Sequence, residues 1–198
     1  EIVKVTARST DSLTVVRAQD NTSARAFSTG DRFELRPVAK LFEDIQIEPE
    51  VDMWRLTTNQ TADGNLTNLE RCDDASFSKI GTGLSFDSSG GIFTFPRTGV
   101  YQVLVQATGR ATSGDTVSIW TQVSTDNFSS NDITSQTTVG DDDSNNTAAF
   151  GQQFVNITNT STHKVRFYGA SIASGSYIQG DTDSNVTSFS FIRLGDSQ

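Results

Sequence analysis

Hydrophobic and polar side chains alternate along short segments of this chain. In residues 99–108, GVYQVLVQAT, the hydrophobic Tyr101, Val103 and Val105 occupy every second position. Side chains two positions apart lie on the same face of a β-strand. The alternation therefore predicts a strand with one buried face.

Nine segments of this kind follow one another after residue 52. We predict strands at 53–59, 75–80, 84–89, 91–96, 99–108, 116–124, 149–158, 163–171 and 188–194. Turn residues separate them, and no alternation of strands with helices appears. This pattern is typical of an all-β protein, and the number of short strands favours a jelly-roll β-sandwich.

The first part of the chain has a different pattern. Residues 1–20 alternate on both sides of a Ser-Thr-Asp-Ser turn, which predicts a β-hairpin, and a third strand is expected at 32–36. Pro37 suits the first turn of a helix, and hydrophobic residues follow at helical spacing: Val38, Leu41, Phe42 and Ile45. The stripe either covers the hairpin or mediates self-association.

Residues 43–52 are acidic and contain Pro49, which ends a helix. We therefore predict three parts. Residues 1–36 form a small β docking module, residues 37–52 form a short amphipathic helix and an acidic linker, and residues 53–198 form the jelly-roll knob.

Several predicted strands also carry large hydrophobic groups on their nominally polar faces. These are Leu104, Trp120 and Tyr168. Large hydrophobic groups on outward faces often mark a contact with another chain. We predict an oligomer interface at these residues; the alternative is that they are scattered surface side chains.

Charge narrows the range of partners. The net charge is -9, and no cluster of Lys or Arg offsets it, so nucleic acid and anionic membrane surfaces are not expected partners. No window approaches the roughly 18 consecutive hydrophobic residues of a membrane span, and no secretory signal opens the sequence. The single Cys72 forms no internal disulfide.

The sequence offers little for catalysis. His163 is the single imidazole, and neither a nucleophile elbow nor zinc-ligand spacing occurs. We therefore expect no catalytic residues and no cofactor. Paired carboxylates for glycan hydrolysis leave no sequence signature, so that alternative stays open.

Two loops share the motif D-x-D-x-N, which places side chains with oxygen ligands at alternate positions. The candidate calcium ligands are Asp141, Asp143 and Asn145 in one loop and Asp181, Asp183 and Asn185 in the other. Neither loop continues to the glycine and distal glutamate of a helix-flanked calcium loop. Solvated turns rich in Asp and Asn explain both equally well.

Residues 90–110, GGIFTFPRTGVYQVLVQATGR, resemble the tumour necrosis factor-like superfamily. The matching residues are Phe93, Phe95, Pro96, Gly99 and Tyr101, and the closing TSFSFIRL, with Phe189 and Phe191, is similar to the last strand of that superfamily. The resemblance covers about residues 54 to 198. It implies a jelly roll assembled as a tight three-fold trimer, with aromatic residues of one sheet near the axis.

Residues 1–45 resemble a segment of tail-fibre and other virion proteins of tailed bacteriophages. The matching elements are Glu1-Ile2, Lys4 to Thr6, Leu13 to Val15 with Arg17, Thr22 to Ala26, Gly30-Asp31 and Glu34-Leu35. The segment departs from that pattern at Ala18, where a glycine is usual after Arg17.

Together the two resemblances imply a non-enzymatic virion structural protein. We expect a homotrimeric fibre or knob that attaches to other virion proteins through its N-terminal part and presents its C-terminal domain to a host-surface glycan or protein. A capsid-decorating or neck protein without a receptor role, a glycan depolymerase and a secreted ligand of the tumour necrosis factor kind are the alternatives.

Overall fold

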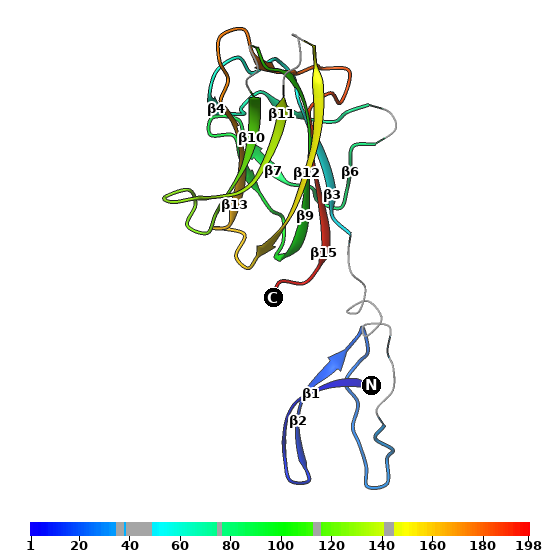
Figure 1. The fold of residues 1–198 in the computed structure, drawn as a ribbon. Helices are drawn as coiled ribbons and strands as arrows, with labels where there is room; N and C mark the ends of the chain where they lie inside the picture. The colour runs from blue at the N-terminus through cyan, green and yellow to red at the C-terminus, as the bar shows by residue number, and fades with distance from the viewer. Residues whose placement is uncertain (35–37, 39–48, 75–76, 113–115, 141–144) are drawn as a thin grey trace. The chain divides into compact units, whose positions relative to one another are not determined.

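The computed structural model describes residues 1–34, 38, 49–74, 77–112, 116–140 and 145–198 (Figure 1). The chain divides into two units, Glu1–Ile47 and Glu48–Gln198. All regular elements in the described residues are strands. The helix predicted after Pro37 lies outside them, apart from Val38. No helix of the described chain is long and apolar enough to cross a membrane.

The predicted hairpin forms in the first unit. Strands β1 (Ile2–Ser9) and β2 (Ser12–Gln19) pair antiparallel. The strand predicted at 32–36 is wrong for its described part, because residues 32–34 have no strand structure. A strand needs a paired neighbour, and among the described residues β1 and β2 pair with each other alone.

Ala18 stands in a left-handed conformation, with φ at 55°. This region strains residues that carry a Cβ and suits glycine. A glycine at this position would adopt the same conformation without that strain.

The second unit contains a seven-stranded sheet in the order β12-β9-β15-β3-β5, with β14 paired to β9 and β6 paired to β3. Its strands are β3 (Val51–Leu56), β5 (Leu69–Arg71), β6 (Lys79–Ile80), β9 (Gly99–Arg110), β12 (Thr147–Ile157), β14 (Tyr177–Ile178) and β15 (Ser188–Gly195).

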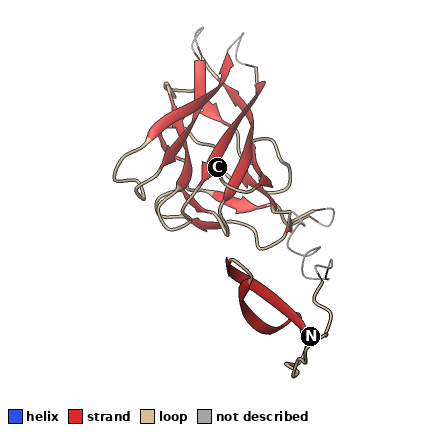
Figure 2. Cartoon of the chain, turned by 90° about the horizontal axis from the view of Figure 1, so that it is seen from below, coloured by secondary structure: helices blue, strands red, loops and turns tan. Residues whose placement is uncertain are grey.

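A six-stranded sheet packs against it, in the order β11-β10-β13-β8-β7 with β4 paired to β13. Its strands are β4 (Gly64–Asn65), β7 (Ser85–Asp87), β8 (Ile92–Thr94), β10 (Thr116–Ser124), β11 (Asp132–Gly140) and β13 (Lys164–Ala170). Figure 2 shows the two layers of strands. The predicted all-β jelly-roll sandwich is confirmed.

The predicted inward faces of several strands form the core between the sheets. Tyr101 and Val103 of β9 are fully buried, as is Phe167 of β13. The rings of Phe167 and Phe189 stack with centroids 4.0 Å apart, which joins β13 of one sheet to β15 of the other. Aromatic packing between the layers therefore holds the sandwich together.

The Pro-x-x-Gly corner before β9 has a steric basis. A Cβ at Gly99, where φ is 155°, would lie 2.6 Å from the carbonyl oxygen of Gly195. The hydroxyl of Tyr101 donates a hydrogen bond to the carbonyl oxygen of Arg97 at 2.9 Å. The glycine and the tyrosine together fix the turn that begins β9.

Candidate functional site

The structure separates the three residues of the predicted interface. Leu104 lies in β9, on the outward face of the seven-stranded sheet, whereas Trp120 and Tyr168 lie in β10 and β13 on the outward face of the six-stranded sheet. Trp120 and Tyr168 are direct cross-strand partners, and their rings stack with centroids 5.7 Å apart. The sandwich therefore has two candidate surfaces, on opposite sides.

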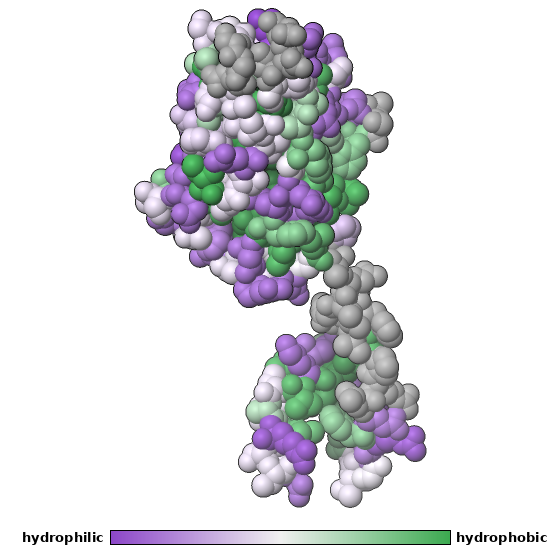
Figure 3. All heavy atoms as spheres, in the orientation of Figure 1, coloured by the Kyte–Doolittle hydropathy of each residue, from purple (hydrophilic) through white to green (hydrophobic). Residues whose placement is uncertain are grey.

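The outward side of the seven-stranded sheet carries hydrophobic residues from four strands, and we call it the apolar face. It is made by Val51, Met53, Val100, Leu104, Phe150, Phe154 and Ile192. Phe150 and Phe154 are each 65% exposed, more than any other large hydrophobic residue in the described part of the chain. Figure 3 shows hydrophobic side chains gathered over the side of the knob where these strands lie.

The register of β12 explains this exposure. Phe150 pairs with Gln106 and Phe154 pairs with Gln102. Both rings therefore lie on the same outward face as these side chains of β9. Val155 and Ile157 lie on the other face of β12 and are buried. Sequence reasoning found the strand but did not assign its faces. The four-residue spacing of the two phenylalanines was the available signal, because it places both on one side of a strand.

Two glutamine side chains on the apolar face donate hydrogen bonds to other protein groups. Gln102 donates a hydrogen bond to Gln152 Oε1 at 3.0 Å, and Gln106 donates one to the carbonyl oxygen of Asn185 at 2.8 Å. These amides can therefore be covered by another chain at a smaller desolvation cost than unpaired amides.

The outward side of the six-stranded sheet carries aromatic rings and planar polar groups, and we call it the aromatic strip. Its members are Trp120, Gln122, Phe128, Asn131, Arg166 and Tyr168. Arg166 donates hydrogen bonds to Gln122 Oε1 at 2.6 Å and to Asn131 Oδ1 at 3.2 Å. Its guanidinium lies 4.2 Å from the ring centroid of Phe128. Burial lowers the pKa of Arg166 from its usual value.

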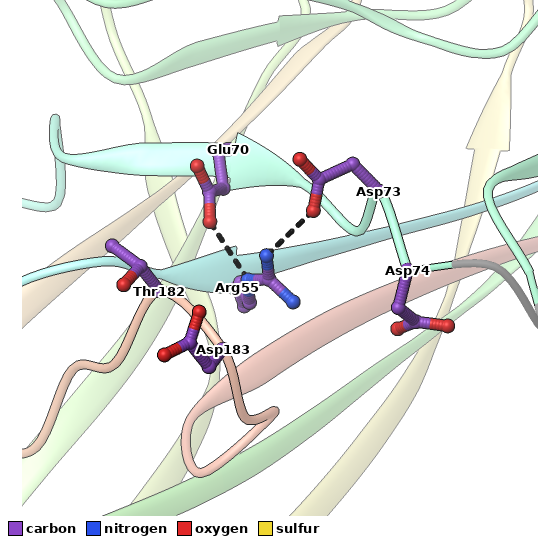
Figure 4. Close-up of a pocket in the computed structure, with 6 residues that line it drawn as sticks. All are labelled: Arg55, Glu70, Asp73, Asp74, Thr182 and Asp183. Atoms are coloured by element: carbon purple, nitrogen blue, oxygen red, sulfur yellow. Dashed lines mark hydrogen bonds and ion pairs between the residues drawn. The ribbon is translucent and has the colours of Figure 1, made fainter.

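An acidic pocket of about 380 Å³ lies beside β3 and β5 (Figure 4). It is lined by Arg55, Glu70, Asp73, Asp74, Thr182 and Asp183. The buried Arg55 donates to Glu70 Oε1 at 2.8 Å and to Asp73 Oδ1 at 2.7 Å, and the bond with Glu70 is the main reason that its pKa is raised. The two nearest carboxylates are thus engaged by the arginine.

The candidate calcium loops are only partly described. Asp141 and Asp143 lie outside the described residues, and Asn145 is exposed. In the second loop, Asp181 accepts backbone hydrogen bonds from Asp183 and Ser184, both at 2.7 Å, and these bonds lower its pKa. Asn185 Oδ1 accepts a hydrogen bond from the thiol of Cys72 at 3.1 Å. The described residues contain no group of three or more His, Cys, Asp or Glu side chains arranged to hold a metal ion.

His163 and Cys72 form hydrogen bonds with uncharged side chains. The His163 ring lies 3.1 Å from Thr158 Oγ1 and 3.2 Å from Thr162 Oγ1. Cys72 is buried, and burial raises the pKa of its thiol. Neither residue is presented to a substrate as a nucleophile with a base.

The N-terminal unit is organised around the carboxylate of Glu1. It accepts hydrogen bonds from Arg17 Nε at 2.9 Å, from the Ala18 amide at 3.0 Å and from the Arg25 amide at 3.1 Å. The hydrogen bonds from Arg17 contribute most to lowering the pKa of Glu1 to about 2. The carboxylate therefore ties the start of β1 to the end of β2 and to the segment after it.

Much of the hydrophobic surface of this unit faces solvent. Its exposed large hydrophobic residues are Val5, Leu13, Val16, Phe27 and Phe33. A cavity of about 370 Å³ is lined by Val3, Val15, Phe27 and Phe33 together with polar residues. A two-stranded sheet is marginally stable alone, and the described residues of this unit contain no further strand to pack against it.

No protein-family model and no curated protein sequence matches this chain. Solved structures of tumour necrosis factor ligands have the same fold. Eiger TNF from S. frugiperda is 13% identical, with a TM-score of 0.58 over 75% of this chain and 94% of that structure. Murine APRIL at pH 5.0 is 10% identical, with a TM-score of 0.55 over 74% of this chain and 99% of that structure. At this identity the likeness shows the fold alone, and the second unit is a TNF-like jelly roll.

Proposed function

We propose that this protein is a non-enzymatic virion structural protein. Its knob self-associates as a homotrimer through the apolar face, its N-terminal unit attaches to other virion proteins, and the assembled knob presents a surface to the host. The observation that carries the proposal is the pair of phenylalanines, Phe150 and Phe154, held on the outward face of an ordered sheet.

The cost of leaving these rings in water supports self-association. Burying a phenylalanine that is 65% exposed removes about 130 Å² of hydrophobic surface from water, which contributes about 3 kcal/mol per ring. Leu104 adds to the same face. On this face, large exposed hydrophobic side chains alternate with amides that already have hydrogen-bond partners, and such a surface resembles a protein interface more than a solvated surface.

A closed ring of three copies is the assembly that the TNF-like fold favours. In a three-fold ring each copy contributes two different patches, and the apolar face is one of them. The six-stranded sheet, on the opposite side of the sandwich, is then available to other molecules.

The N-terminal unit supports attachment to other virion proteins. Its described residues form one hairpin with exposed hydrophobic side chains, and this part of the unit buries little hydrophobic surface. Its resemblance to virion segments of tailed bacteriophages points to a particle as the docking partner.

Light scattering on the full chain tests the assembly. We expect a three-chain mass for the parent and a single-chain mass for the double variant Phe150→Ser, Phe154→Ser. Ile133→Ser is the matched control, because Ile133 is 45% exposed on β11 of the other sheet. A parent that stays a single chain at micromolar concentration overturns the proposal.

Two further measurements separate the alternatives. Failure of labelled protein to bind host cells, with particle binding retained, favours a capsid-decorating or neck protein. Release of reducing sugar from host polysaccharide favours a depolymerase.

A further inference from the structure

We propose that the aromatic strip is a binding site for an oligosaccharide of pyranose sugars. This inference rests on the proposed host-surface role and names its ligand class and location. The sugar rings lie against Trp120 and Tyr168, and their hydroxyl groups are met by the polar atoms between these rings and Phe128.

The strip begins with a row of side chains across four strands. Gln136 of β11 pairs with Trp120, Trp120 pairs with Tyr168, and Tyr168 pairs with Asn65 of β4. Directly paired residues lie on the same face of a sheet. The two rings lie within 23° of parallel, so they form one half-buried aromatic surface bordered by amides on both sides.

The polar atoms of these rings are available to a ligand. Among the described residues, the indole N–H of Trp120 and the hydroxyl of Tyr168 make no hydrogen bond with protein, and neither atom is sealed from solvent. By contrast, the hydroxyl of Tyr177 donates to Asn146 Oδ1 at 2.8 Å. Both atoms can therefore hydrogen-bond to a ligand without breaking a hydrogen bond to another described residue.

The other end of the strip is built rigidly. The Phe128 amide donates to Ser124 Oγ at 2.8 Å, and the Asn127 amide donates to the carbonyl oxygen of Thr162 at 2.9 Å. Asp126 accepts hydrogen bonds from both the amide and the hydroxyl of Ser130, which lower its pKa to about 2. This loop therefore holds Phe128 and Asn131 beside Arg166 before any ligand arrives, which reduces the entropic cost of binding.

The chemistry of the strip distinguishes a sugar from other ligands. A pyranose has hydrophobic C–H faces that pack on aromatic rings and hydroxyl groups that both donate and accept hydrogen bonds. The strip places two stacked rings and Phe128 beside the planar polar groups of Gln122, Asn131 and Arg166, which suits both parts of a sugar. The net charge of -9 disfavours a polyanion such as nucleic acid.

The position of the strip is compatible with assembly. It lies on the six-stranded sheet, while the apolar face lies on the seven-stranded sheet on the opposite side of the sandwich. Three strips on one particle-bound trimer bind a repeating polysaccharide with an avidity far above that of a single site. Weak binding by each strip is therefore sufficient for attachment.

An array of hexose and N-acetylhexosamine oligosaccharides and bacterial surface polysaccharides, probed with the full chain, tests the proposal. We expect at least one oligosaccharide to bind. In titrations with it, Trp120→Ala and Arg166→Gln lower the affinity at least about tenfold. Trp120→Phe, which keeps a ring, retains more affinity than Trp120→Ala, and it is the variant to use if the alanine form does not fold.

The outcomes separate this inference from the proposed assembly. The double variant Phe150→Ser, Phe154→Ser loses the three-chain mass but keeps the affinity of each chain for a short oligosaccharide. A silent array, or binding that is unchanged in Trp120→Phe and in Arg166→Gln, overturns the sugar site even when the trimer is found. Binding to a host protein on glycan-free cells also overturns it.

Discussion

The buried carboxylate of Asp52 gives a sharp test of what holds one edge of the knob together. Asp52 lies in β3 with no exposed surface. Its carboxylate accepts hydrogen bonds from Arg71 Nε at 2.8 Å and from the Leu84 amide at 2.7 Å, and Arg71 Nη2 donates both to Asp52 and to the carbonyl oxygen of Leu84. One side chain therefore connects β3, β5 and the segment before β7.

Replacing Asp52 with alanine removes the acceptor and leaves its donors behind. Loss of one partner of a buried ion pair costs about 3–5 kcal/mol, and the side chain of Arg71 is 29% exposed, so we expect a loss of about 3 kcal/mol in the free energy of unfolding. Asp52→Asn keeps the size and one acceptor, and we expect a loss of about 1–2 kcal/mol.

Urea unfolding of the full chain, followed by circular dichroism, measures these losses. Unfolding of an oligomer depends on protein concentration, so all variants are compared at one concentration. Asp73→Asn is the control. Asp73 is 77% exposed, and the buried Arg55 with which it pairs keeps its bond to Glu70 at 2.8 Å, so we expect a loss below about 1 kcal/mol. If Asp52→Ala costs no more than this control, the reasoning from burial is refuted.

Three further outcomes are expected. Ala18 has a left-handed conformation with φ at 55°, which strains alanine by about 1–2 kcal/mol. Ala18→Gly removes this strain and should increase the hydrogen-exchange protection of the β1–β2 amides, and lower protection in the variant contradicts this. Burial raises the pKa of Tyr101 to about 12. Its contribution to the free energy of unfolding is therefore fully present below pH 10 and is lost as the pH rises through 12. Tyr101→Phe should lose less stability than the parent over that pH range, and equal losses count against this reasoning. Because Cys72 is buried and the pKa of its thiol is raised, a thiol reagent at pH 8 should modify the folded chain far more slowly than the urea-unfolded chain, and equal rates speak against burial.

The strands that sequence reasoning missed show the limit of periodicity. Residues 132–140, DITSQTTVG, form the nine-residue strand β11, although most of their side chains are polar. The segment pairs with β10 along its length, and that partner stabilises the strand. β4, β5 and β14 are two or three residues long, too short to show a period. Pairing with a neighbour decided these strands.

The candidate surfaces could likewise be predicted from the sequence only in part. The sequence determined that Leu104, Trp120 and Tyr168 would lie on outward faces, because alternation along a strand assigns each side chain to one of two sides. It did not determine which strands share a sheet. Hydrogen-bonded pairing placed Leu104 beside Phe150 and Phe154, and Trp120 against Tyr168.

The sequence by itself determined the class of this protein, all-β with a buried hydrophobic face in most of its long strands, because that information is local and is repeated every two residues. Tertiary structure alone decided that its outward hydrophobic residues form two surfaces of different chemistry on opposite sides of the sandwich. The order of strands in a sheet depends on contacts between residues far apart in the chain, which no local pattern records.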